Sequence, residues 1–140
     1  MTPEDRFAVQ DLLARYTWVF DTGDYETYPL LFAPDGMFVQ EGVEFRGRDV
    51  LLEFAREQAG RSARGNRHHN TQVLFEDWGD DWCRLRCYSL HINQPEPGGP
   101  GVIRRQGWYR DVCVKLDGEW YFAERRWGEW QPDDLLQHRL

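Results

Sequence analysis

Residues 12–36, LLARYTWVFDTGDYETYPLLFAPDG, contain the pattern from which the fold can be predicted. Apolar side chains recur here at spacings of three and four residues, which is the period of one face of an α-helix. Thr2 and Pro3 supply a capping hydroxyl and a proline for the first helical position, so we expect the helix to begin there. The chain should turn at residues 21–24 and enter a short second helix, capped by Asp24 and ended by residues 34–36.

The remaining sequence predicts one hairpin, one further helix and four long strands. Residues 37–40 and 43–45 are expected to pair as the hairpin, and Asp49 should cap a helix that ends at Gly60. A polar basic loop, interpretable as a lid, occupies residues 61–67. Alternating strands are expected at residues 68–77, 82–92, 102–116 and 119–128.

Helices followed by a long antiparallel meander indicate one α+β domain over residues 1–140. The helices should pack on one face of a strongly bent sheet, and the bend should enclose a pocket. The share of aromatic residues, 15%, is high, and such side chains both fill cores and line pockets.

Charge and composition exclude several classes of partner. The net charge of −7 and a pI near 5.0 argue against a nucleic-acid or anionic membrane surface, which would need a concentrated basic patch. No apolar run approaches the roughly 20 residues of a spanning helix, so we expect a cytoplasmic protein that contacts no membrane. The 3 cysteines are expected to be reduced and buried.

An aspartate and a histidine that converge in a dry pocket form a general base. Asp21 falls where the first helix should end, and strand alternation places His69 on the same side as Val73 and Phe75, facing the pocket. His91 should face inward from the next strand, whereas His68 should point away. The plainer alternatives remain a turn-forming role for Asp21 and a buried, hydrogen-bonded core position for each inward histidine.

Tyr16 could donate its phenol to a substrate oxygen, or could simply belong to the core. Arg125 and Arg126 should lie on opposite sides of the last strand, where either could anchor a carboxylate or carbonyl or form a surface ion pair. The pair His68-His69 makes a poor chelate because neighbouring strand residues face opposite sides, so we expect no metal site and no cofactor. Residues expected to contact substrate are Trp18, Phe20, Gln40, Tyr109 and Arg126.

At these residues the chain resembles the SnoaL-like branch of the nuclear-transport-factor-like superfamily, and within it the group of scytalone dehydratase and bile-acid 7α-dehydratase. The stretch at residues 12–36 is similar to that group's helix, turn and helix with its active-site aspartate, here Asp21. His69 and His91 match the group's histidines, and LDGEWYFAERRWGEW, residues 116–130, is similar to its last hairpin and tail. The resemblance implies a cystatin-like cone that holds a small-molecule pocket.

The sequence also departs from this group. Phe20 and Gln40 stand where scytalone dehydratase has a pair of tyrosines, which argues against that enzyme's own substrate. Tyr16, five residues before Asp21, is instead similar to the tyrosine of bile-acid dehydratase.

The function expected from the residues and the resemblance is that of a cofactor-independent lyase of the dehydratase type. Its substrate would be small and apolar, with a carbonyl group or a polycyclic skeleton, and the base would be His69 oriented by Asp21, with His91 or Tyr16 as the acid. Two alternatives stay open: an isomerase or cyclase with the same dyad, and a non-catalytic binding or assembly module. Members of the family usually assemble through the outer sheet face, so a homo-oligomer, dimer or trimer, is expected.

Overall fold

Helix α1 (Pro3–Thr22) begins at the predicted cap. The Thr2 hydroxyl accepts the Asp5 N–H, and the Asp5 carboxylate accepts the Thr2 N–H at 2.8 Å, so a capping box pairs two N–H groups at the helix start. The same carboxylate accepts hydrogen bonds from Lys115 and Trp120, which ties the start of α1 to the sheet. Gly23 ends the helix with φ of 75°, a left-handed conformation that glycine adopts without steric penalty.

The second predicted helix is a single 3-10 turn, η1 (Tyr28–Leu31). The prediction that residues 34–36 stop a helix is wrong, because strand β1 (Phe32–Gln40) already begins at Phe32 and contains them. They interrupt the pairing of β1 with its neighbour, where the register shifts between Phe32 and Met37. Pro34 has no N–H to give to a ladder, so its place in this irregularity is physically reasonable.

The six strands form one open mixed sheet in the order β2-β1-β6-β5-β4-β3. The pairing is antiparallel except for β1 with β6, which is parallel. The predicted hairpin and the four long strands are confirmed. Beyond β1, the strands are β2 (Val43–Arg46), β3 (Asn66–Trp78), β4 (Trp82–Asn93), β5 (Val102–Leu116) and β6 (Glu119–Glu129).

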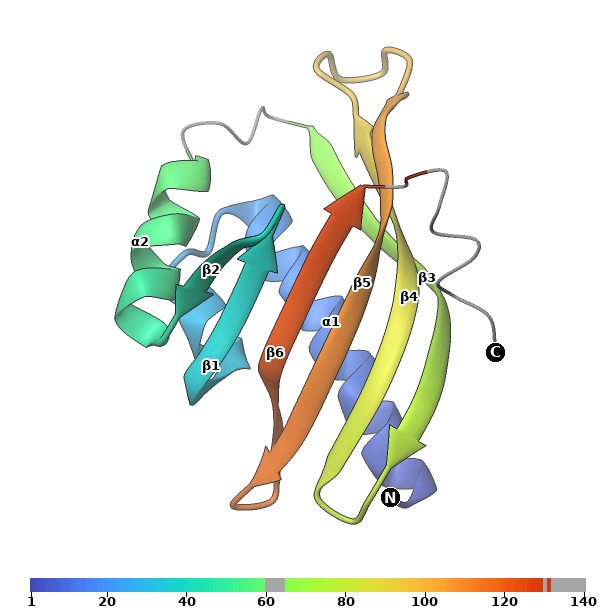
Figure 1. Cartoon of the computed structure of the whole chain (residues 1–140). Helices are drawn as coiled ribbons and strands as arrows, with labels where there is room; N and C mark the ends of the chain where they lie inside the picture. Colours follow the sequence, from blue (N-terminus) through green and yellow to red (C-terminus); the bar gives the residue numbers. More distant parts are fainter. Residues whose placement is uncertain (60–64, 130, 132–140) are drawn as a thin grey trace.

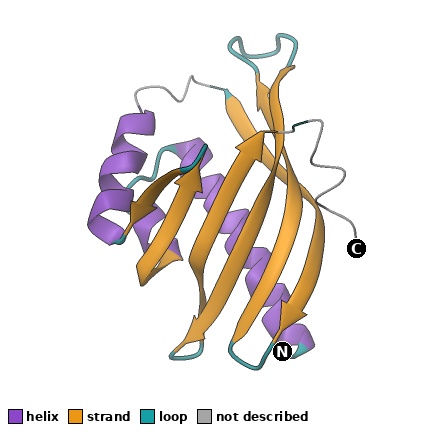
Figure 2. Ribbon diagram, viewed as in Figure 1, coloured by secondary structure: helices purple, strands orange, loops and turns teal. Residues whose placement is uncertain are grey.

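One face of the sheet is covered by helices, which gives the α+β architecture its two layers. Figure 1 shows α1 running diagonally behind β6, β5, β4 and β3, with α2 (Arg48–Ala59) beside β1 and β2. Figure 2 shows that, among the residues that the structure describes, no helix covers the opposite face. The core lies between α1 and the sheet, and its fully buried members include Val9, Leu12, Phe32, Leu85 and Phe122.

The structure describes residues 1–59, 65–129 and 131. The predicted helix end at Gly60, most of the basic loop with Arg61 and Arg64, and Trp130 lie outside these ranges. Within the described ranges, no helix is both long and apolar enough to cross a membrane. Cys83, Cys87 and Cys113 are free and buried, as predicted.

Candidate active site

The last turn of α1 meets the first residues of β3 through a carboxylate and an imidazole. Asp21 pairs with His68, its Oδ1 next to the ring Nδ1, and its Oδ2 accepts the backbone N–H of the same residue at 2.8 Å. The Asp21 side chain is 7% exposed and the His68 side chain 11%. Because the carboxylate can only accept, the Nδ1 position carries the proton, and Nε2 is left as the basic nitrogen of the ring.

The predicted pairing of Asp21 with His69 is therefore wrong, since His69 is exposed and its neighbour His68 faces inward. A β-bulge is the cause. Between Thr71 and Leu74, three steps along β3 oppose only two steps along β4, and Gln72 has a φ of 50°. The extra residue reverses which side chains of β3 face inward before and after the bulge. Alternation counted from Val73 towards the start of the strand therefore assigns His68 and His69 to the wrong faces.

His91 faces inward from β4, as predicted, and its ring lies against that of His68 with 4.0 Å between centroids. Its Nε2 is 3.0 Å from the hydroxyl of the buried Ser89. Burial, followed by the nearby charges of His68 and Arg105, lowers the pKa of His91 from 6.5 to about 3. His91 is consequently a neutral imidazole at physiological pH and can offer a hydrogen bond, not an imidazolium proton.

Both histidines line a cavity of about 650 Å³, a size typical of small-molecule sites. The aromatic part of its wall comes from α1, β1, β2, α2, β5 and β6. The aromatic lining residues are Tyr16, Phe20, Phe38, Phe45, Phe54, Tyr109 and Trp127.

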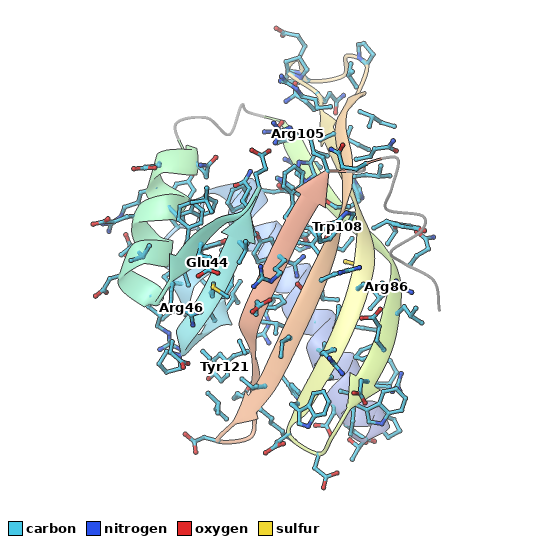
Figure 3. The ribbon with its side chains drawn as sticks, viewed as in Figure 1. Glu44, Arg46, Arg86, Arg105, Trp108 and Tyr121 are labelled. Carbon is cyan, nitrogen blue, oxygen red and sulfur yellow. The ribbon has the colours of Figure 1, made fainter. Side chains whose placement is uncertain are left out.

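The lining also contains polar side chains, with Gln40, Glu41 and Glu57 among them, and two arginines from β5. A bulge opposite residues 91 and 92 inserts one extra residue into β5 at Arg104. Arg105 pairs with Glu129 at 3.1 Å, and Figure 3 shows it near the upper end of β6.

Tyr16 forms the floor of this cavity together with Tyr109. Its hydroxyl is 3.4 Å from that of Tyr28, and its ring meets Tyr109 edge-on at 5.9 Å. Burial and the neighbouring phenols raise the pKa of Tyr16 and Tyr109 well above the usual value of 10.0. Both phenols therefore keep their protons and remain hydrogen-bond donors.

Of the residues expected to bind substrate, Phe20, Gln40 and Tyr109 line the cavity, whereas Trp18 and Arg126 do not. Trp18 is 70% exposed on the outer side of α1, because it lies two positions along the helix from Tyr16 and Phe20. Arg126 pairs with Glu124 and lies outside the cavity lining. A register shift at residues 112 and 113 of β5 changes the alternation along β6 and turns Arg125 inward instead.

Sequence reasoning missed a buried ion pair beneath the cavity floor. Arg125 and Asp111 both have side chains with 0% exposure, and their closest atoms are 2.9 Å apart. The guanidinium stacks on the rings of Tyr109, at 3.7 Å, and Tyr16, at 4.1 Å. The available signal was one charged residue within the apolar pattern of each strand, Asp111 on β5 and Arg125 on β6. Strict alternation along β6, however, places only one of Arg125 and Arg126 on the inner face.

A second hollow of about 480 Å³ lies on the other side of the Asp21–His68 pair, between α1 and β3. Trp18 and His69 line it together with Asp21. Asp21 does not line the larger cavity, so its carboxylate contacts the His68 ring on the side away from that cavity. Within residues 1–59 and 65–129, no three histidine, cysteine or acidic side chains are grouped to hold a metal ion.

Comparison with protein-family models matches residues 1–126 to the SnoaL-like domain. Among solved structures, a protein of unknown function from Mycobacterium tuberculosis is similar, with 32% identity, a TM-score of 0.83, and coverage of 93% of this chain and 79% of that one. A provisionally named scytalone dehydratase from Novosphingobium aromaticivorans has 25% identity and a TM-score of 0.77, over 91% of this chain and 85% of its own.

The fold itself is cystatin-like, as the resemblance implied. A nuclear-transport-factor-like protein with a cystatin-like fold from Novosphingobium aromaticivorans superposes with a TM-score of 0.84 at 22% identity, over 98% of this chain and 90% of that one. The search of curated proteins found no match.

Proposed function

The chain belongs to the SnoaL-like domain family, and from the site that it carries we propose that it is a cofactor-independent lyase of the dehydratase type. The family includes dehydratases, isomerases and cyclases. The observation that supports the proposal is the Asp21–His68 pair, which leaves one basic nitrogen at the wall of an aromatic cavity. The proposed substrate is small and largely apolar, with a carbonyl group or a polycyclic skeleton. Its apolar part would pack on the aromatic side chains, and its oxygens would meet the polar ones of the same lining.

In this reaction His68 replaces His69 as the general base. Its Nε2 removes a proton from the carbon next to the substrate carbonyl, and the electron pair of that C–H bond moves onto the carbonyl oxygen to give an enolate. Asp21 fixes the ring orientation and stabilises the imidazolium that forms, because it holds Nδ1–H. A base of this kind contributes about 10²–10⁴-fold in rate.

The second half of the reaction returns the proton. The His68 imidazolium is the strongest acid beside the enolate, since His91 is neutral. It protonates the departing hydroxyl at the β-carbon, so that the C–O bond breaks, the enolate collapses to an unsaturated ketone and water leaves. Tyr16 and His91 donate hydrogen bonds to the carbonyl or hydroxyl oxygen, which orients the substrate and stabilises the developing charge.

Two observations favour catalysis over a binding module whose pocket is filled by its own side chains. The cavity is large enough for a ligand, and a carboxylate and two imidazoles meet beside it. An isomerase would use the same base but return the proton to another carbon, with no loss of water. Analysis of the products therefore distinguishes elimination from isomerisation.

We also propose that the chain is cytoplasmic and assembles as a homo-dimer or trimer through the outer sheet face. Figure 3 shows Arg86, Trp108 and Tyr121 on this face, turned away from α1. Tyr88, on β4, is exposed on the same side of the sheet. Sedimentation of the purified protein would test the assembly directly.

The experiment that tests the proposed function is a screen of β-hydroxy ketones of increasing ring number for conversion to unsaturated ketones, followed by absorbance. We expect at least one cyclic member to be converted by the native protein, with water as the second product. The variant H68Q should lose about 10²–10⁴-fold in turnover on that compound. Conversion that is unchanged in H68Q, or products isomeric with the substrate, would contradict the lyase proposal.

A further inference from the structure

The ion pair of Asp111 and Arg125 is costly for the fold to bury, and its hydrogen bonding is incomplete. Both side chains are fully buried, yet they share a single hydrogen bond of 2.9 Å. Within the described residues, Asp111 Oδ1 and the Nε and Nη2 atoms of Arg125 have no partner. A pair of this kind contributes little net stability compared with apolar side chains of similar volume, so its presence calls for another explanation.

The pair is oriented like a dipole. Its positive end faces the tyrosines: the Arg125 guanidinium stacks on Tyr16 and Tyr109, and it lowers the pKa of both phenols against the larger effect of burial. Its negative end faces the cysteines of β4 and β5, where Asp111 raises the pKa of Cys87 and Cys113 in addition to other causes that include burial. The positive charge is therefore the one that is closer to the cavity floor.

The floor above this charge also has a hydrogen-bond donor to spare. Tyr16, Tyr28 and Tyr109 have three hydroxyl hydrogens between them. The hydrogen bonds of Tyr16 with Tyr28 and with Tyr109 need only two of these hydrogens. Tyr16 and Tyr109 line the cavity. An oxygen of a bound molecule can accept the remaining hydrogen bond.

We propose that the Asp111–Arg125 pair is an electrostatic positioning device, which keeps a positive charge beneath Tyr16 and Tyr109 and so stabilises negative charge on a substrate oxygen bound to these phenols. Arg125 does not line the cavity, so it acts through the two tyrosines and not by direct contact. The inference rests on the proposed lyase function, because an enolate oxygen is the negative charge that it would stabilise. A preorganised charge in a water-poor site is effective because it needs no reorganisation during the reaction.

The test uses 4-nitrophenol as a probe, because its phenol and phenolate forms absorb at different wavelengths. We expect the native protein to bind the probe with a larger phenolate fraction than R125Q, by about threefold to tenfold in the ratio of the two forms at one pH. Burial raises the pKa of Asp111 to about 7, so the comparison is made at a pH above this value, where the carboxylate carries its charge. There the variant D111N removes the balancing negative charge and should change the ratio in the opposite direction, above that of the native protein. A purely structural role would not give opposite signs for the two variants.

The matched control is R126Q, since Arg126 is the next residue on β6 and lies outside the cavity lining. It should leave the probe's spectrum unchanged. Should R125Q fail to fold, as judged by its circular dichroism, the phenolate fraction of the probe bound to D111N still tests the proposal, because it should exceed that of the native protein. Equal ratios in all folded variants, or a native protein that binds neither form of the probe, would overturn the proposal. No turnover is needed, so the ratios in the native protein, R125Q, D111N and R126Q can be compared even if the lyase proposal fails.

Discussion

The Asp21 carboxylate holds His68 twice, by pairing with the ring Nδ1 and by accepting the backbone N–H at 2.8 Å. The ring orientation is thus fixed together with the start of β3, and the proton is kept on the nitrogen that faces away from the cavity. An imidazole anchored in this way needs no further rearrangement before it accepts a proton from a bound molecule.

The variant D21N should lower kcat by about 10²–10⁴-fold with little change in KM. The amide can donate to Nδ1 and so favours the tautomer in which Nε2 is protonated and no longer basic. The measurement is steady-state kinetics on the hydroxy ketone identified in the screen. D24N is a suitable control because Asp24 accepts the Thr27 N–H in the following turn and is not part of the cavity; a similar loss in both variants would argue against the role of Asp21.

The bulge at Gln72 should be sensitive to the side chain at that position. Gln72 has a φ of 50°, which a β-branched residue adopts only with strain, whereas glycine adopts it freely. We expect Q72V to lower the free energy of unfolding by about 1–2 kcal/mol, and Q72G to leave it unchanged or slightly raised. Urea denaturation measures both, and equal stabilities of Q72V and Q72G would contradict this account of the bulge.

The fold was predictable from the sequence because its signals are local. The Thr2 cap, the apolar stripe of α1 and the turns between the long strands each depend on neighbouring residues alone. The cavity and its Asp–His pair were also expected, but the histidine was assigned to the wrong position.

Bulges caused the errors in the site. A strand with one extra residue reverses its faces, and no local signal in β3 or β6 marks the insertion, since Gln72 and Ala123 are ordinary strand residues. His68 was therefore placed outside, and alternation left open which of Arg125 and Arg126 faces inward. In the structure, His68 and Arg125 both face the interior. A bulge depends on which residues of the partner strand pair with which, and that register is a property of the whole sheet.

The low pKa of His91 predicts a dependence of stability on pH. The folded protein binds a proton at His91 only near pH 3, whereas the unfolded chain does so near 6.5, so the unfolded state holds more protons between these values. Stability should consequently be unaffected by His91 above pH 6.5 and should fall as the pH decreases below it.

The variant H91Q isolates this effect, because Asp111 and the other titrating groups are common to both proteins. Between pH 7 and 4.5 the native protein should lose about 2–3 kcal/mol more of its free energy of unfolding than H91Q does. Urea denaturation at the two pH values gives the difference. Parallel pH dependence in the two proteins would show that His91 titrates normally in the folded state.

The Tyr16 hydroxyl should matter for turnover more than for stability. Y16F keeps the ring contacts with Tyr109 and Phe122 but removes a donor from the cavity floor, so we expect kcat to fall by about 10–100-fold and Tm to change little. W18A is the control on the same helix, since Trp18 lies outside the cavity. A larger loss of activity in W18A than in Y16F would mean that substrate binds on the outer side of α1.

Whether His68 or His69 is the base can be decided by comparing H68Q with H69Q. Each protein is incubated in D₂O with a cyclic ketone, and exchange of the protons next to the carbonyl is followed by NMR, which reports removal of a proton without any need for elimination. We expect exchange by the native protein and by H69Q at similar rates, and a loss of about 10²–10⁴-fold in H68Q. Exchange that survives in H68Q and disappears in H69Q would contradict it.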